Sequence, residues 1–167
     1  MEQIKRQVFF SFHYDADAWR AGMIRNMGVV DKSSTFSDND WEEVKKKSEF
    51  AIKRWINSQM EMRSCLVVLI GEETWMRDWV EYEIRKAYEL EKGIVGIYIH
   101  NLKDKYGNQT EKGLNPFDYI NTINGEPLSK YVRAFDPRYA TSSNVYRDIN
   151  DNLSNLIEEA IENAGYY

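Results

Sequence analysis

At residues 65–70 the chain reads Cys65-Leu66-Val67-Val68-Leu69-Ile70, a continuously apolar run in a sequence of 167 residues. Its length and its β-branched residues are typical of a strand that is covered on both faces, as in a parallel sheet. Two similar runs lie on either side of it, Val8-Phe9-Phe10-Ser11-Phe12 and Ile94-Val95-Gly96-Ile97-Tyr98-Ile99. The sequence therefore predicts a central, mostly parallel sheet.

Segments with helical spacing of apolar residues separate and follow these runs, over residues 15–27, 40–62, 78–91 and 143–164. Asp40 followed by Glu43 is a capping-box pattern, and Gly93 and Gly165 are expected to stop the two helices that precede them. Strands that alternate with helices predict an α/β fold, a flavodoxin-like three-layer sandwich around the sheet.

Two parts of the sheet are less clear from the pattern. A second strand is expected either at Val29–Val30 or at Thr35–Phe36, and a last one within residues 131–135. From residue 100 to about 137 the pattern is broken by turn signals such as Gly107, Gly113 and Gly125. Loops of this length in compact domains are often lids or binding loops.

Composition excludes several classes of function. The formal net charge of −5 argues against a large phosphate-binding surface, so no nucleic-acid partner is expected. No apolar stretch is long enough for a membrane span or a signal sequence, so we expect a cytoplasmic protein without a membrane partner. Cys65 is the single cysteine and lies in a strand run, which favours a buried thiol over a catalytic one.

Ligands of open parallel α/β sheets bind outside the carboxyl ends of the strands, which directs attention to residues 11–15, 71–79 and 99–103. Glu83 lies in the first turns of the helix that begins near this edge, where the helix dipole favours an ionised carboxylate. Such a group could accept hydrogen bonds from ribose hydroxyls and stabilise an oxocarbenium cation. The alternative is a solvated carboxylate paired with Lys86 or Lys92.

Other chemistries have no motif to support them. The sequence contains no GxGxxG fingerprint, P-loop or GxSxG elbow, and no Cys/His spacing typical of zinc, so no metal is expected. The aromatic content of 14% is high, and its rings either fill the core or line a site for flat ligands. Trp19, Trp41 and Trp55 are expected to be core or interface anchors.

Two stretches resemble a known family. Val8-Phe9-Phe10-Ser11-Phe12-His13-Tyr14-Asp15 is similar to the opening strand and loop of TIR domains. A second stretch resembles the segment that follows the central strand of TIR domains, where a polar loop leads to a Trp and then to a Glu four positions later. It reads Gly71-Glu72-Glu73-Thr74-Trp75-Met76-Arg77-Asp78-Trp79-Val80-Glu81-Tyr82-Glu83-Ile84. With Lys103-Asp104-Lys105-Tyr106-Gly107-Asn108 and Asn115-Pro116-Phe117-Asp118-Tyr119, the resemblance is to the TIR-like, ThsB-type proteins of the bacterial Thoeris anti-phage defence system.

The resemblance implies a TIR-type fold in one domain over residues 1–167, with a core at about 6–119 and a C-terminal elaboration and helix at about 120–165. It also implies an enzyme that cleaves NAD+, its substrate, without a further cofactor. The product would be a cyclic ADP-ribose isomer, a diffusible nucleotide signal that activates a separate effector. Homo-oligomer formation is left open.

Carried over residue by residue, the resemblance makes Glu83 the catalytic carboxylate. Phe10, Ser11 and His13 would border the nucleotide pocket, although His13 could equally lie in a surface loop. Their positions further suggest that Tyr14, Trp79 and Tyr82 line the pocket around nicotinamide or adenine. Trp79 could instead be a packing residue of the core. Two alternatives stay open: a non-catalytic TIR-like scaffold for protein interactions, and a nucleoside deoxyribosyltransferase-like enzyme.

Overall fold

The computed structural model describes residues 5–31 and 38–167. Within them four strands form one sheet in the order β1-β2-β3-β4, and all neighbouring pairs are parallel. The strands are β1 (Val8–Ser11), β2 (Cys65–Ile70), β3 (Gly93–Tyr98) and β4 (Ala134–Phe135). The α-helices are α1 (Tyr14–Arg25), α2 (Asp38–Val44), α3 (Glu49–Glu61), α4 (Asp78–Glu89) and α5 (Ser142–Asn163). Short 3₁₀ helices lie at η2 (Thr74–Met76), η3 (Pro116–Tyr119) and η4 (Leu128–Lys130).

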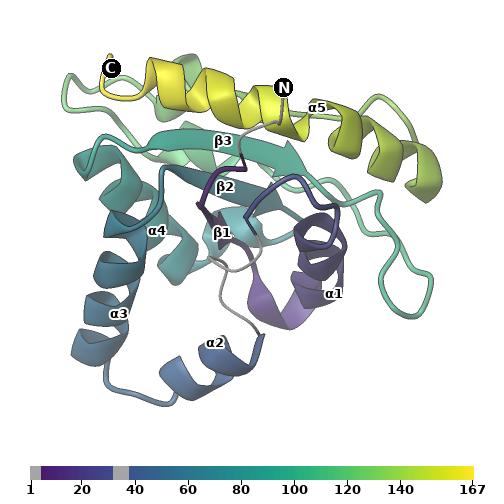
Figure 1. The fold of residues 1–167 in the computed structure, drawn as a ribbon, viewed down its shortest axis with the longest axis horizontal. Helices are drawn as coiled ribbons and strands as arrows, with labels where there is room; N and C mark the ends of the chain where they lie inside the picture. The colour runs from purple at the N-terminus through teal and green to yellow at the C-terminus, as the bar shows by residue number, and fades with distance from the viewer. Residues whose placement is uncertain (1–4, 32–37) are drawn as a thin grey trace.

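Helices cover both faces of the sheet, because successive strand residues point to opposite sides. Phe10 and Val67 pack on one face against α1 and α5, whereas Phe9 and Val68 pack on the other against α3 and α4. Figure 1 shows α5 lying along one side of the strands and α3 and α4 on the other. The predicted flavodoxin-like, TIR-type three-layer α/β fold is confirmed.

The expected second strand is not found where the structure can test it. Val29 and Val30 form a bend, and Val30 is buried in the core that α1 and α5 share. The other candidate, Thr35–Phe36, lies outside the described residues. The observed order β1-β2-β3-β4 matches positions 1-3-4-5 of the flavodoxin-like order 2-1-3-4-5. The last predicted strand is confirmed, because β4 lies within residues 131–135.

The single helix predicted over residues 40–62 is wrong, since two helices, α2 and α3, occupy this range. Ser48 separates them: its side chain accepts a hydrogen bond from Ala51 N at 3.2 Å and caps α3. A serine that bonds to the backbone in this way favours a helix start over helix continuation. Asp40 lies inside α2, so it is not the expected N-cap.

Gly93 does not stop a helix, contrary to the prediction, because it is the first residue of β3. The chain reverses earlier, at Glu91, whose φ is 54°. Gly93 is instead required by packing, since a Cβ there would lie 2.9 Å from the backbone carbon of Ala160 in α5. Gly165 follows α5 with a φ of 82° and ends it as predicted. None of the described helices is both long and apolar enough to cross a membrane.

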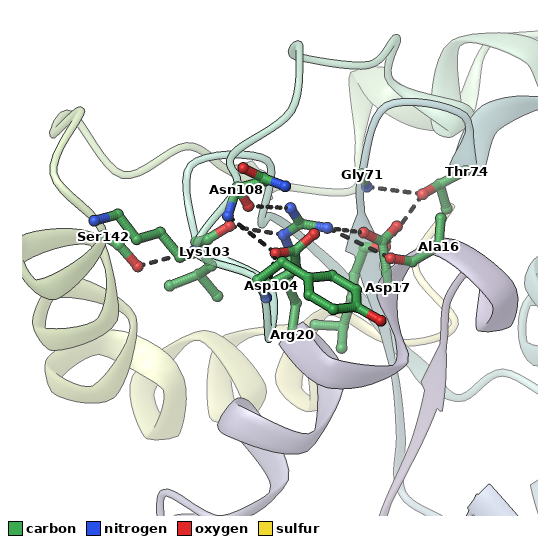
Figure 2. A network of polar contacts seen from close by, with 12 residues as sticks. Ala16, Asp17, Arg20, Gly71, Thr74, Lys103, Asp104, Asn108 and Ser142 are labelled. Carbon is green, nitrogen blue, oxygen red and sulfur yellow. Dashed lines mark hydrogen bonds and ion pairs between the residues drawn. The ribbon is translucent and has the colours of Figure 1, made fainter.

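A buried arginine fixes the first part of the irregular region after β3. The Arg20 guanidinium donates to Leu102 O at 2.7 Å and to Asn108 O at 2.8 Å, and it forms an ion pair with Asp17 at 2.9 Å (Figure 2). The side chains of Arg20 and Asp17 are 1% and 2% exposed. Burial raises the pKa of Asp17, and Arg20 opposes that rise. The pair therefore joins α1 to residues 102–108.

Two glycines extend this attachment to the exit of β2. A Cβ on Gly113 would overlap the backbone oxygen of Gly71, and a Cβ on Gly71 would overlap the Asp17 carboxylate. Gly71 N also donates to Thr74 Oγ1 at 2.7 Å, which holds the turn into η2 (Figure 2). The two ends of residues 102–113 are thus packed against α1 and the exit of β2, whereas most of the residues between them are exposed.

We predict that Arg20→Met lowers the free energy of unfolding by about 3 to 5 kcal/mol, because it leaves the Asp17 charge buried and unpaired. The double variant Arg20→Met/Asp17→Asn should recover part of that loss. Urea denaturation provides the measurement, with Arg147→Met on the exposed face of α5 as the control. A loss in Arg20→Met no larger than in Arg147→Met would contradict the prediction.

Candidate active site

Glu83 lies on α4 at the carboxyl end of β1, and its side chain is buried with 6% exposure. Its Oε1 accepts a hydrogen bond from Ser11 Oγ at 2.8 Å. Ser11 is the last residue of β1 and is fully buried. The two residues are 72 positions apart in sequence. They meet because Val80, Ile84 and Ala87 of α4 pack on the sheet face that β1 shares.

Aromatic rings surround the Glu83 carboxyl. The hollow beside it has a volume of about 30 Å³ and is lined by Phe10, Phe12, Tyr14, Trp41, Trp79 and Glu83. Three of these rings lie near one another: the ring centroids of Phe12 and Tyr14 are 6.3 Å apart, and those of Tyr14 and Trp41 are 6.4 Å apart. We call this group of five rings the aromatic wall.

Burial controls the protonation of Glu83. It raises the pKa of this carboxyl to about 8, although the hydrogen bond from Ser11 acts in the opposite direction. The loss of hydration thus acts against the ionised form that the helix dipole was expected to favour. The surface-pairing alternative is also wrong, since Lys86 pairs with Glu89 and Lys92 donates to Glu61 O.

The structure brings most of the predicted site residues together. Phe10, Tyr14 and Trp79 line the hollow with Glu83, and Ser11 bonds to the carboxyl. These positions are compatible with the predicted roles in catalysis and substrate binding, which stay predictions.

Two predicted residues lie apart from the hollow. His13 is the N-cap residue of α1, and its buried Nδ1 has no hydrogen-bond partner within the described residues. The Tyr82 hydroxyl donates to Asn57 Oδ1 at 2.7 Å on α3, and its ring meets the edge of Trp79 at 5.8 Å. Tyr82 thus supports Trp79 and does not line the hollow, while the roles predicted for both residues remain untested.

Sequence reasoning directed attention to residues 11–15 but assigned no site role to Phe12, and it assigned none to Trp41, although both line the hollow. Phe12 follows Ser11 directly and could have been found from its place at the strand end. Trp41 was expected to be a core or interface anchor, and it does contact Trp55 at 6.2 Å. Its place beside Glu83 depends on how α2 packs on α1, and no motif records that packing.

Larger hollows exist elsewhere, two of about 550 Å³ and one of about 780 Å³. They lie at the end of α4, beside α1 and at the start of α5. In the described part of the chain, none of these three is lined by a buried ionisable side chain. No group of three His, Cys, Asp or Glu side chains within residues 5–31 and 38–167 could hold a metal ion. The Glu83 hollow is therefore the candidate active site.

A parallel sheet between two helical layers, with a buried carboxyl at its carboxyl edge, is consistent with a protein of the TIR type. The family model described as Thoeris protein ThsB, TIR-like domain, matches residues 9–104. The chain belongs to this family of ThsB TIR-like domains.

A curated relative from Bacillus cereus (strain MSX-D12) is 45% identical over 120 residues. It is named "Putative cyclic ADP-D-ribose synthase ThsB1". The matched part covers 69% of this chain and 62% of the relative. The chain thus corresponds to less than two thirds of that protein's length.

We predict that Glu83→Gln removes a pH dependence from protein stability. A carboxyl whose folded pKa is raised stabilises the fold fully below its ordinary pKa of 4.5, and that stabilisation is lost as the pH rises through about 8. The difference in unfolding free energy between the variant and wild type should therefore change with pH. Between pH 4 and pH 8 it should shift in favour of the variant by on the order of 3 kcal/mol. Urea denaturation of both proteins across this range gives the comparison, and parallel curves would show that the pKa of Glu83 is not raised in the folded protein.

Proposed function

We propose that this protein is an NAD+-cleaving TIR enzyme that releases nicotinamide and a cyclic ADP-ribose isomer. The observation that carries the proposal is the Glu83 carboxyl, buried at the carboxyl edge of the sheet and bordered by the aromatic wall. The name of the Bacillus cereus relative, a cyclic ADP-D-ribose synthase, supports the same activity.

The arrangement suits the cleavage of a glycosidic bond. When the bond between nicotinamide and ribose breaks, its electron pair leaves with the neutral nicotinamide and positive charge develops on the ribose. An ionised Glu83 would stabilise that charge and accept hydrogen bonds from the ribose hydroxyls. Aromatic rings such as Tyr14 and Trp79 offer flat apolar surfaces to nicotinamide and exclude water from the cation. NAD+ is the substrate here, and we propose no further cofactor.

Cyclisation follows when a nucleophile of the same nucleotide, in place of water, attacks the ribose carbon and then loses a proton. Exclusion of water by the aromatic wall favours this outcome over hydrolysis. We propose that the cyclic product is a diffusible signal in the cytoplasm, that it activates a separate effector, and that it serves anti-phage defence.

The energetic cost of burying Glu83 argues against a purely structural scaffold. A carboxyl with a pKa of about 8 reduces stability at neutral pH, and an amide or apolar residue would avoid that cost. Perturbed carboxyls in a sheet-edge hollow are more typical of catalytic sites. The enzyme is therefore the function that the geometry supports best.

The test is product identification from purified protein incubated with NAD+. Wild type should release nicotinamide and a cyclic nucleotide, resolved by chromatography and mass spectrometry, while Glu83→Gln should lower both by on the order of 10³-fold because the cation loses its counter-charge. Glu81→Gln is the matched control, since Glu81 is exposed on the same helix and pairs with Arg85.

Equal turnover by wild type and Glu83→Gln would contradict the catalytic role. If wild type releases no nicotinamide, even in lysate from phage-infected cells, the scaffold interpretation is favoured. Release of a free base from deoxynucleosides would favour the deoxyribosyltransferase-like alternative.

We further predict that Ser11→Ala shifts the pH profile of kcat/KM to higher pH. The Ser11 hydrogen bond lowers the pKa of Glu83, so its loss should raise that pKa and delay ionisation. The midpoint should move by about 1 pH unit, which corresponds to one hydrogen bond to a charged group. Ser11→Thr, which keeps the hydroxyl, should stay near wild type, and a change in rate without a change in midpoint would contradict this positioning role.

A further inference from the structure

A hollow of about 550 Å³ lies between α1 and the turn that follows β3. Residues 15, 18, 22 and 25 line it from α1, and their spacing of three or four positions places them on one face of the helix. Residues 104–106 line it from the turn. We call this hollow the α1 groove. Its volume is in the range of about 300 to 1,000 Å³ that is typical of small-molecule sites.

Two exposed aromatic rings line the α1 groove from different elements. Trp19 of α1 is 55% exposed, and Tyr106 of the turn is 76% exposed. A core role for Trp19, which was one of two expectations, is therefore wrong. Large apolar side chains that gather at a hollow on the surface are typical of binding sites. A flat ligand in the groove could contact both rings.

The turn that carries Tyr106 is held in place without a ligand. Asp104 Oδ1 accepts hydrogen bonds from Tyr106 N and Asn108 N, each at 2.9 Å. The buried Arg20 binds Asn108 O at 2.8 Å and so ties the turn to α1 (Figure 2). The two sides of the groove are therefore pre-formed, which lowers the entropic cost of binding.

Small residues keep the α1 side of the groove open. Ala18 and Gly22 lie four positions apart on the lining face of the helix. A Cβ on Gly22 would have Arg25 Nη2 as its nearest neighbour, at 3.8 Å, so packing does not require a glycine. A glycine inside a helix costs about 1 kcal/mol relative to alanine. Gly22 thus leaves room in the groove at a cost to the stability of α1.

The charges of the groove suit an anionic group at one end. Arg25 and Asp15 both line it and lie ten residues apart, which corresponds to about 15 Å along a helix. Lys105 adds positive charge on the turn, where its Nζ lies 5.1 Å from the Tyr106 ring centroid. Among the described residues, no buried ionisable side chain lines the groove, which suits binding and not catalysis.

We propose that the α1 groove is a second binding site, for a nucleotide: Trp19 and Tyr106 stack on the base, and Arg25 and Lys105 bind the phosphate. Stacking on aromatic rings tolerates any base, so the base is not specified. No described residue that lines the Glu83 hollow lines the α1 groove. The second site therefore does not depend on the proposed NAD+ cleavage.

The test is isothermal titration calorimetry of the full chain with AMP, adenosine and inorganic phosphate. AMP should bind more tightly than either of the others, because it alone offers both a base and a phosphate. Trp19→Ala should weaken AMP binding by about tenfold, the size of one base stacking on an aromatic ring. Tyr106→Phe keeps the ring and should bind as wild type does. Tyr166→Ala is the matched control, since Tyr166 is 85% exposed and does not line the groove.

Gly22→Met tests the same site without removing a ring. The added side chain should fill the groove and weaken AMP binding by at least tenfold, whereas methionine is a better helix former than glycine, so α1 should keep its fold. Gly22→Ala, which adds only a Cβ, should retain binding. Circular dichroism of each variant checks that the helices are intact.

Two results would overturn the second site: no AMP binding by wild type, or AMP binding that Trp19→Ala and Gly22→Met leave unchanged. Nicotinamide release from NAD+, measured on the same samples, keeps this outcome apart from the proposed function. Cleavage without AMP binding in the groove would refute the second site alone. AMP binding that Gly22→Met removes, in a protein that does not cleave NAD+, would support the second site and refute the enzyme.

Discussion

The site depends on one carboxyl group being kept from water. Glu83 can lie at the edge of the sheet only because α4 packs its apolar side onto the strands and presents the residues at its start to the end of β1. The Ser11 hydroxyl satisfies one carboxyl oxygen, and the aromatic wall covers the remainder. The result is a group whose protonation is set mainly by burial and is sensitive to any change in its cover.

A second buried charged group, an ion pair, lies in α1 near the same edge of the sheet. Arg20 and Asp17 pair inside α1, and the guanidinium also binds two backbone oxygens of the chain after β3. The close contacts at Gly71 and Gly113 leave no space for side chains there. The polar contacts on this side are therefore made by backbone and buried charge, whereas the cover over Glu83 is made by the rings of the aromatic wall.

Apolar patterning was sufficient to predict β1, β2 and β3, the layers and the place of Glu83 near the carboxyl edge, because each depends on local periodicity and on the rule for parallel sheet edges. It failed where a contact between distant segments decides. Gly93 was taken as a helix stop, but its role is the close approach of α5 at Ala160. Trp41 and Arg20 were not singled out, because Trp41 meets Tyr14 of another helix and the Arg20 guanidinium, besides pairing with nearby Asp17, binds backbone oxygens of a distant loop.

Cover and protonation are coupled in this arrangement. The aromatic wall keeps water from the Glu83 carboxyl, and that burial raises its pKa to about 8. Burial disfavours the charged form of a carboxyl, and hydration favours it. The hydrogen bond from Ser11 acts against burial, so the protonation of Glu83 depends on the balance between its apolar cover and this one polar contact.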